Sequence, residues 1–378
     1  MPATPQADPE QLAAARATIA VLMGRHHVPG LSVAVTGKSR LIYTEGFGRA
    51  DLPGNRPATP DTAYLWFSMS KIATATVAVR LADEGALDLD APVSDYFPAY
   101  RARTGSQPRV RQLLSHTAGA PNPVPLRWVL PADATAAEVR TRTCRILDRH
   151  GRPSRPAGGP ARYSNVGYLV LAEVISAAAG EPFEDHVRRV LLQPAGMHAT
   201  DYTPPETADR ATGYVRLPRG LAPALRMALP PGIVGHRSGD LVALRPFRVA
   251  GAGYGGLIGG VTDAAQLLRL HLGDGQVDDI RVLRPESARA MRNIHAPGRP
   301  FDLGLGWFCR SADRTAQPAF VEHWGTGGGF WNALRLYPDQ GVGIAVMANT
   351  TRPYGHHALM TALLHAVIPR TTPSDTGS

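Results

Sequence analysis

The sequence predicts a protein of two lobes, an α/β lobe built from both ends of the chain and a mostly helical lobe between them. The 378 residues exceed the length at which a single core usually stops growing. Strand-like apolar segments gather near the two ends of the chain, whereas short helices, prolines and loops fill the middle. We therefore expect one sheet that receives strands from both ends and is covered by the terminal helices.

The N-terminal segment begins with an amphipathic helix and continues as a hairpin. Residues 9–27 place apolar side chains at helical spacing, and Pro29-Gly30 ends this pattern. Strands are predicted at Leu31–Thr36 and Leu41–Glu45, and a second helix is predicted over Leu65–Leu81. These elements supply the first half of the expected sheet and its first covering helix.

The middle of the chain is predicted to contain mainly helices, and the C-terminal part to contain both strands and helices. The clearest helices of the middle are at Val110–Leu114, Ala136–Asp148, Val166–Ala179 and Pro182–Leu192, with Gly180 and Gly196 where helix ends are expected. The C-terminal part predicts a helix at Thr262–Leu272, strands at Phe320–His323, Asn332–Tyr337 and Val342–Met347, and a last helix at Tyr354–Val367.

These elements give a domain assignment. Residues 9–75 and 245–370 form the sheet lobe, residues 76–244 form the mostly helical lobe, and residues 371–378 form a flexible tail. A cleft between two such lobes is a usual place for a binding site.

Composition excludes several classes of protein. Hydrophobic residues make up 44% and charged residues 19%, which is typical of a globular protein. Cys144 and Cys309 are too few for a disulfide framework and form no C-x-x-C zinc motif. The formal charge is +9, but the arginines are scattered, so we expect no nucleic-acid partner.

The same reading bears on location and partners. No signal-like N-terminus and no run of about 18 apolar residues is found. We therefore expect a cytoplasmic protein without a membrane partner, whose substrate is a small molecule. The sequence leaves the oligomeric state open.

The first chemical signal is Ser68-Met69-Ser70-Lys71. Only two of the 40 basic residues are lysines, and a lysine can lose its proton when buried whereas an arginine in practice cannot. Residues three apart on a helix face the same side, so Ser68 and Lys71 present a hydroxyl and an amine together. A desolvated amine can activate a serine as a nucleophile. Taken alone, this spacing is also found on ordinary surface helices.

Two further segments add to this signal. In Tyr163-Ser164-Asn165, the phenol can carry a proton and Asn165 can hold the lysine or the substrate, although the same residues also suit a plain helix start. In His323-Trp324-Gly325, a strand end would line the cleft, with Gly325 allowing close approach of a substrate. The backbone N–H groups of Ser68 and Thr326 are the candidate oxyanion hole.

In this order and spacing the three segments resemble the penicillin-recognising serine hydrolases. The resemblance is to the branch with class C β-lactamases, related D,D-peptidases, family VIII esterases and related acyltransferases, whose second motif is Y-x-N. It implies a β-lactamase/transpeptidase-like fold with an antiparallel sheet. It also implies that Ser68 is acylated, that Lys71 and Tyr163 share the acid and base roles, and that Asn165, His323, Trp324 and Gly325 contact substrate. His116 matches a segment that is usually structural.

Departures from that family's pattern indicate the substrate. His323 stands where β-lactam enzymes usually have a lysine, and a mostly neutral histidine grips a carboxylate less well. Trp324, Phe330 and Trp331 are expected to narrow the site and make it apolar. We therefore expect hydrolysis of small-molecule esters or related activated acyl groups. An acyltransferase or transamidase, and a non-catalytic sensing or binding module, remain the alternatives.

No cofactor or metal is expected. Gly251-Ala252-Gly253-Tyr254-Gly255-Gly256 fits G-x-G-x-x-G, but no helix follows it at once and no repeated βαβ context surrounds it. His26-His27 and His356-His357 are adjacent pairs, whose side chains are expected to diverge on a helix and not to share a metal ion.

Overall fold

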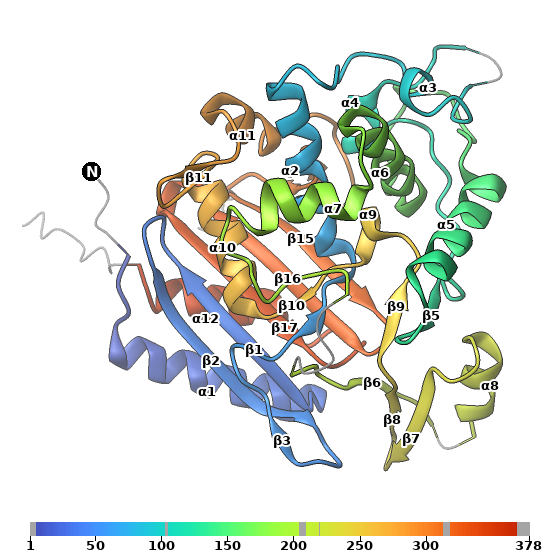
Figure 1. The fold of residues 1–378 in the computed structure, drawn as a ribbon. Coiled ribbons are helices and arrows are strands. Elements are labelled where there is room, and N and C mark those ends of the chain that lie inside the picture. The colour runs from blue at the N-terminus through green and yellow to red at the C-terminus, as the bar shows by residue number, and fades with distance from the viewer. Residues whose placement is uncertain (1–4, 103–104, 204–208, 219, 313–317, 369–378) are drawn as a thin grey trace, which may run out of the picture.

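The computed structural model describes residues 5–102, 105–203, 209–218, 220–312 and 318–368. Its main feature is an eight-stranded sheet with the strand order β13-β14-β15-β16-β17-β1-β2-β3, and all neighbouring strands are antiparallel (Figure 1). The strands are β1 (Gly30–Thr36), β2 (Leu41–Asp51), β3 (Arg56–Pro57), β13 (Asp302–Leu303), β14 (Phe308–Arg310), β15 (Phe320–Gly327), β16 (Phe330–Tyr337) and β17 (Val342–Ala348).

The two ends of the chain meet in the centre of this sheet. β1 pairs with β17 along nearly its whole length, from Leu31 opposite Ala348 to Thr36 opposite Gly343. The predicted antiparallel sheet built from both ends of the chain is thus confirmed. The predicted strands near residues 320, 332 and 342 correspond to β15, β16 and β17.

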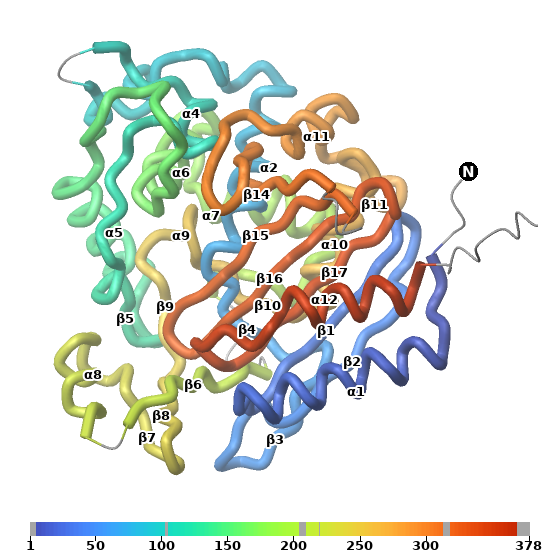
Figure 2. The backbone as a smooth tube through the Cα atoms, turned by 180° about the vertical axis from the view of Figure 1, so that it is seen from behind, coloured from blue at the N-terminus to red at the C-terminus, as the bar shows by residue number. Residues whose placement is uncertain are grey.

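Alternation along the central strands sends apolar side chains to both faces of the sheet. Leu31, Val33 and Val35 of β1 belong to one core and Ala34 to the other. The first core is covered by α1 (Pro9–His26) and α12 (His356–His365), which lie over one face in Figure 2. The opposite face is covered by α10 (Val261–Leu272) (Figure 1). The expected covering by terminal helices is therefore correct for one face.

The helical lobe surrounds two buried helices, α2 (Ser70–Asp83) and α6 (Asn165–Ala179). The Oγ atom of Ser164 accepts a hydrogen bond from the N–H of Gly167 at 2.9 Å and caps the start of α6. Gly180, with φ of 68°, ends it as expected. The other helices of this lobe are α3 (Val93–Tyr96), α4 (Val110–Leu114), α5 (Ala136–His150), α7 (Phe183–Val187), which continues as a π-helical turn over Arg188–Leu192, and α9 (Ala252–Gly255).

The helical lobe also contains strands that the sequence did not predict. β6 (Gly213–Arg216), β7 (Val234–Ser238) and β8 (Leu241–Leu244) form a separate three-stranded sheet beside α8 (Ala222–Ala228). β5 (Val129–Pro131) pairs with β9 (Phe247–Val249). These strands are three to five residues long, which is too short for alternation to reveal them.

Residues 247–255 pack with helical elements, since β9 pairs with β5 and α9 contacts α2 and α6. The predicted domain boundaries at residues 75 and 245 stay a prediction. The predicted tail at 371–378 lies outside the described residues. Among the described residues, no single helix is long and apolar enough to cross a membrane. Taken together, α6 and the segment Phe183–Leu192 have that length and apolar composition, but the two are bent by 76° relative to each other.

Several short elements complete the fold. They are β4 (Tyr64–Leu65), which pairs with β10 (Ile258–Gly259), the hairpin of β11 (Gln276–Val277) and β12 (Ile280–Arg281), α11 (Pro285–Met291), and the 3-10 turns η1 (Phe67–Met69) and η3 (Pro338–Gln340).

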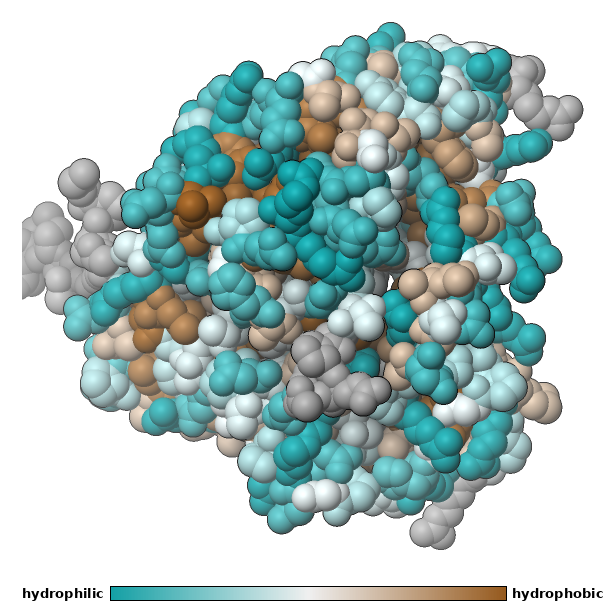
Figure 3. Space-filling model, in the orientation of Figure 1, coloured by the Kyte–Doolittle hydropathy of each residue, from teal (hydrophilic) through white to brown (hydrophobic). Residues whose placement is uncertain are grey.

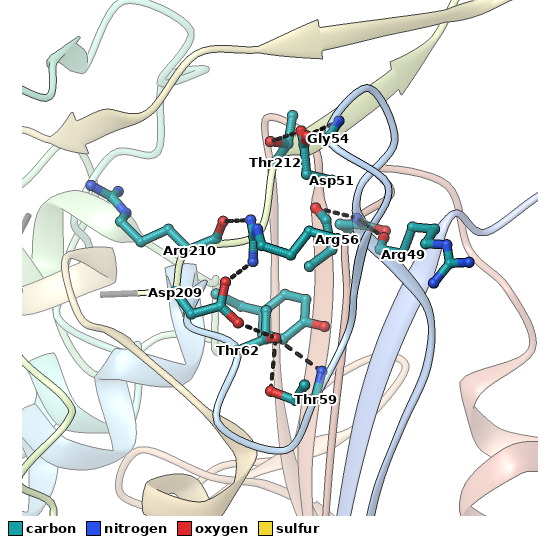
Figure 4. A network of polar contacts seen from close by, with 12 residues as sticks. Arg49, Asp51, Gly54, Arg56, Thr59, Thr62, Asp209, Arg210 and Thr212 are labelled. Carbon is teal, nitrogen blue, oxygen red and sulfur yellow. Dashed lines mark hydrogen bonds and ion pairs between the residues drawn. The ribbon is translucent and has the colours of Figure 1, made fainter. Parts of the chain in front are cut away.

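A polar network fastens the sheet to the segment that leads into β6 (Figure 4). Arg56 of β3 forms an ion pair with Asp209 and donates to the carbonyl oxygen of Arg210 at 2.5 Å. Thr62 donates to the other carboxylate oxygen of Asp209 at 3.0 Å. The two chain regions are thus held together by contacts that are remote in sequence.

Asp51 belongs to the same network, and its contacts predict how the free energy of unfolding depends on pH. Asp51 accepts hydrogen bonds from Thr212 Oγ1 at 2.7 Å and from the N–H of Gly54 at 2.7 Å. Burial alone would raise the pKa of Asp51, but these bonds and Arg56 together lower it. Thr212→Val should therefore lower the free energy of unfolding by about 1 kcal/mol at neutral pH.

The pH dependence checks this cause. A lowered carboxyl pKa contributes stability that is present above the unfolded-state pKa and is lost as pH falls through the folded-state pKa. The difference between Thr212→Val and the parent protein, measured by urea unfolding, should shrink at acidic pH. A difference that stays constant with pH would contradict a role for the ionised Asp51.

Candidate active site

Ser68 lies in a tight turn between a short strand and a long helix. The chain passes from β4 through η1 into α2, so the helix predicted over 65–81 begins only at Ser70. Phe67 has a positive φ of 48°, a conformation that costs a bulky residue about 1–3 kcal/mol. This kink, which local sequence propensity does not reveal, brings Ser68 to the start of α2 and into a cavity.

β15 lies directly against this turn. A Cβ atom on Gly325 would overlap the carbonyl oxygen of Trp66, and one on Gly327 would overlap the ring of Phe67. Gly325 does not line the cavity. Gly325 is needed for the close approach of β15 to the turn that carries Ser68, and its expected contact with substrate stays a prediction.

Lys71 is fully buried and has three oxygen neighbours. Its Nζ atom lies 3.0 Å from Ser68 Oγ, 2.8 Å from Asn165 Oδ1 and 3.0 Å from the carbonyl oxygen of Tyr254. Burial holds the pKa of the Lys71 amine well below its usual value. A neutral amine has two N–H donors and one lone pair, which suits donation to Asn165 and Tyr254 and acceptance from the Ser68 hydroxyl.

The carbonyl of Tyr254 is a site group that the sequence did not reveal. Tyr254 belongs to α9, inside the segment that fits G-x-G-x-x-G. A Cβ atom on Gly253 would overlap the carbonyl oxygen of Tyr168, so this glycine allows α9 to pack closely on α6. The glycines thus bring a backbone acceptor to Lys71.

Tyr163 lies over the same amine. The ring centroid of Tyr163 is 4.7 Å from Lys71 Nζ. Burial raises the pKa of the Tyr163 phenol, and a hydrogen bond with Ser68 offsets part of that rise. The phenol is therefore a neutral acid at neutral pH, placed beside the serine hydroxyl.

The ring of His116 packs against the ring of Tyr163. Their ring centroids are 4.6 Å apart, and His116 Nδ1 accepts a hydrogen bond from the N–H of Ser164 at 3.1 Å. Burial, together with Lys71 and His323, lowers the pKa of His116 well below its usual value. A supporting role agrees with the expectation that this histidine is structural.

Asn165 connects the start of α6 to the site. Its side-chain oxygen receives the bond from Lys71, and its backbone N–H donates to Asn122 Oδ1 at 3.0 Å. Asn122 was not among the predicted residues, because nothing in its loop sequence indicates that it reaches α6. Asn165 is buried and also lines the cavity, as expected for a residue that contacts both lysine and substrate.

His323 of β15 faces the site in its neutral form. Its Nδ1–H donates to the carbonyl oxygen of Trp324 at 2.8 Å, and its ring stacks on Phe308 with centroids 4.4 Å apart. Burial and the nearby Lys71 lower the pKa of His323 to about 3. This position therefore supplies no positive charge at neutral pH.

The predicted residues surround one cavity of about 420 Å³. Ser68, Tyr163, Asn165, His323, Trp324 and Thr326 line it. Its apolar wall is made by Pro125, Pro300, Phe301, Leu303, Phe308 and Trp324, and Arg299 lies at its rim as an exposed cation.

Two of the aromatic residues expected in this wall lie elsewhere. Phe330 packs on Tyr64 and Phe67, and Trp331 packs on His356. Phe301 and Phe308 line the cavity where the sequence predicted Phe330 and Trp331.

Comparison with known proteins identifies the family. Residues 15–367 match the family model described as Beta-lactamase. The chain belongs to the Beta-lactamase family. Penicillin-binding protein 4 of Amycolatopsis lactamdurans is 28% identical over 357 residues, covering 87% of this chain and 82% of that protein.

One further relative agrees with this membership, and one solved structure confirms the expected β-lactamase/transpeptidase-like fold. The D-alanyl-D-alanine-carboxypeptidase/endopeptidase AmpH of Escherichia coli (strain K12) is 26% identical, covering 83% of this chain and 77% of that protein. The octameric penicillin-binding protein homologue from Pyrococcus abyssi superposes with a TM-score of 0.76 at 22% identity, covering 94% and 77% of the two chains. This Beta-lactamase family member is thus a serine hydrolase-type enzyme.

In this Beta-lactamase family member, Ser68 and Thr326 line the same cavity. β14 pairs only with Phe320–Glu322, so beyond Glu322 that edge of β15 faces the turn of Ser68. The N–H groups of Ser68 and Thr326 therefore remain the candidate oxyanion hole.

One polar group away from the site bears on metal binding. The rings of His356 and His357 are 4.1 Å apart, so they do not diverge as expected. Together with Glu322 they bring possible ligand atoms within 4.8 Å of one another. However, the buried Arg335 donates to Glu322 at 2.6 Å and contacts His357. Because this guanidinium would repel a divalent cation, the group does not fit a metal site.

Proposed function

We propose that the protein hydrolyses small-molecule esters or related activated acyl groups through an acyl-Ser68 intermediate. The observation that carries the proposal is the buried Lys71 amine, 3.0 Å from Ser68 Oγ and held by two other acceptors. A serine is a weak nucleophile until a nearby base removes its proton. A neutral amine in this position is such a base.

In the acylation step, Lys71 Nζ takes the proton of Ser68 Oγ while that oxygen attacks the substrate carbonyl carbon. The N–H groups of Ser68 and Thr326 would donate to the oxyanion that forms. As the carbon–oxygen bond to the leaving group breaks, the Tyr163 phenol gives its proton to the leaving alcohol. The proton on Lys71 then passes to Tyr163, which restores both groups.

In the deacylation step, the same groups act in the reverse order. Tyr163 and Lys71 together remove a proton from a water molecule, which attacks the acyl carbon. The proton returns to Ser68 Oγ as its bond to the acyl group breaks. The free acid leaves, and the serine and the amine return to their starting forms.

The walls of the cavity favour an apolar acyl group. Phe301, Phe308 and Trp324 supply aromatic surface, and His323 is neutral. An ester of a hydrophobic acid would bury this surface, and each methylene buried would contribute about 0.8 kcal/mol. A carboxylate near His323 would find no compensating charge there.

A second substrate class follows from Arg299. This exposed cation lies at the rim of the cavity and could meet a carboxylate of the substrate. Relatives named as a penicillin-binding protein and a D-alanyl-D-alanine carboxypeptidase agree with such a substrate. Acyl transfer to an alcohol or amine is the remaining alternative, since any nucleophile that enters the apolar cavity could replace water.

Intact-mass spectrometry distinguishes these possibilities. The protein would be incubated with aryl esters of increasing acyl length, a thioester, a cephalosporin and a D-alanyl-D-alanine peptide. We expect rapid turnover of the esters and a transient mass increase equal to the acyl group. Efficient turnover of the cephalosporin or the peptide, with negligible ester turnover, would reject the ester proposal. Added alcohols and amines would reveal transfer as a second product.

Tyr163→Phe tests the role of the phenol. The ring contacts with His116 and Lys71 are kept, so folding should be unchanged, while kcat/KM should fall by about 10²-fold. The loss should be greatest for alkyl esters, whose leaving groups need a proton, and smallest for nitrophenyl esters. An equal loss for both leaving groups would contradict proton donation by Tyr163.

A further inference from the structure

A second cavity, of about 260 Å³, lies beside the C-terminal half of α5. Four arginines line it, namely Arg127 from the preceding loop and Arg142, Arg145 and Arg149 from α5. The other lining residues are Trp128, Ile146 and His150. No carboxylate is among the residues that line it. The cavity is therefore strongly basic in a chain whose arginines are otherwise scattered.

Among the described residues, none of these four arginines forms an ion pair with a carboxylate. Arg127 donates to the carbonyl oxygen of Met227 at 2.9 Å, and Arg142 donates to that of Arg127 at 3.2 Å. In contrast, Arg140 on the same helix pairs with Glu173. The hydrogen bonds to carbonyl groups hold two of the guanidinium groups in place and leave their charge uncompensated.

Support of the helix C-terminus does not account for the whole cluster. Arg149 and His150 lie in the last turn of α5, where a positive charge stabilises the helix dipole. Arg142 and Arg145 lie earlier, beyond the reach of that effect, and Arg127 is not on the helix. The right-hand flank of the molecule, over α5, is mainly hydrophilic (Figure 3).

We propose that this cavity binds a phosphate-bearing small molecule, of the phosphomonoester or diphosphate class. The planar guanidinium group donates two parallel hydrogen bonds to phosphate oxygens. Several unpaired cations call for an anion with more than one negative charge, which a single carboxylate does not carry. The apolar side chains of Trp128 and Ile146 lower the local dielectric and strengthen the attraction.

The size of the cavity agrees with this choice. At about 260 Å³ it is smaller than the roughly 300–1,000 Å³ of pockets that enclose a whole drug-sized ligand. It suits a phosphate head group, with the rest of the ligand outside. A flat acidic protein surface would not need a concave site of this kind.

Residue contacts link the wall of this cavity to the active site. Pro125, which lines the catalytic cavity, is two residues from Arg127 in the same loop. The ring of Trp128 meets that of Tyr254 edge-on, with centroids 5.8 Å apart, and the carbonyl of Tyr254 accepts from Lys71. The anion is either a free ligand or the phosphate of the acyl donor, and binding can be measured without assuming the catalytic role of Ser68.

Isothermal titration calorimetry with pyrophosphate at constant ionic strength tests the proposal. The full chain should bind one equivalent saturably, and the double substitution R145Q/R149Q should weaken binding about tenfold or more. The control R152Q/R155Q removes the same charge from positions just beyond α5 that are exposed, as Arg145 and Arg149 are, but do not line the cavity, and it should leave binding nearly unchanged. Arg127→Gln, from the other wall, should weaken binding independently of any effect on α5.

Three outcomes would overturn the proposal. They are the absence of saturable binding, an equal loss in the R152Q/R155Q control, and tighter binding of an acidic peptide than of pyrophosphate, which would indicate a protein partner. Kinetics separate the two sources of phosphate. Pyrophosphate that inhibits hydrolysis of an acyl-coenzyme A thioester, but not of a neutral aryl ester, identifies the donor, and failure of all ester turnover leaves the binding result intact.

Discussion

Ser68→Ala is expected to abolish both acylation and turnover. Removal of the nucleophilic serine lowers kcat by about 10⁶-fold in the serine protease subtilisin, and we expect a loss of similar size here because the remaining groups cannot form the covalent intermediate. Ser68 is only partly buried, and its side chain is not part of the core. The fold should therefore survive the change, with thermal unfolding close to that of the parent protein.

Ser70 provides a matched control two positions away. Its Oγ atom is fully buried and accepts a hydrogen bond from the N–H of Leu257 at 3.2 Å. Ser70→Ala leaves this N–H without its partner and should cost about 1–3 kcal/mol of stability.

Acylation separates the two serines. Intact-mass analysis with an aryl ester should show the acyl adduct in the parent and in Ser70→Ala, but not in Ser68→Ala. An adduct on Ser68→Ala would reject Ser68 as the nucleophile.

The sequence predicted the parts of the site that depend on local spacing. The sequence places Ser68 and Lys71 one helical turn apart. In the structure their side chains are in contact, although the helix begins at Ser70 and not at Leu65. Tyr163 and Asn165 also lie beside Lys71, because they stand at the start of a helix that the apolar pattern of the following residues predicts.

The parts that were missed depend on contacts between remote segments. The carbonyl of Tyr254 is a backbone group, and any residue type could supply it, so no motif marks it. Phe301 and Phe308 enter the cavity because β13 and β14 extend the sheet beside β15.

Gly325 shows the same limit in another form. Its place in the third motif predicts a contact with substrate, and the structure adds a close contact with the carbonyl of Trp66 that the motif did not indicate. A glycine in a strand indicates that another group approaches the backbone closely, but the sequence does not identify that group.

Lys71→Arg is the second change with a large expected effect. The guanidinium group stays protonated at all accessible pH values, so it cannot take the proton of Ser68. We expect kcat/KM to fall by about 10³–10⁴-fold, as for Lys71→Ala, although a positive charge is kept. If the lysine acted only through its charge, Lys71→Arg would retain most of the activity and Lys71→Ala would not.

The pH dependence of the parent protein gives an independent check. Because burial lowers the pKa of Lys71, the amine is neutral above that value, and kcat/KM should decrease as pH falls through it. Between the lowered folded-state pKa and the higher unfolded-state pKa, the unfolded chain binds one more proton, so stability should rise with pH. Lys71→Met removes this term and should make the protein more stable at neutral pH, which thermal unfolding would measure. The burial that keeps the Lys71 amine unprotonated also lowers the stability of the fold. An unprotonated amine is what the reaction requires as a base, so the loss of stability and the activity have the same cause.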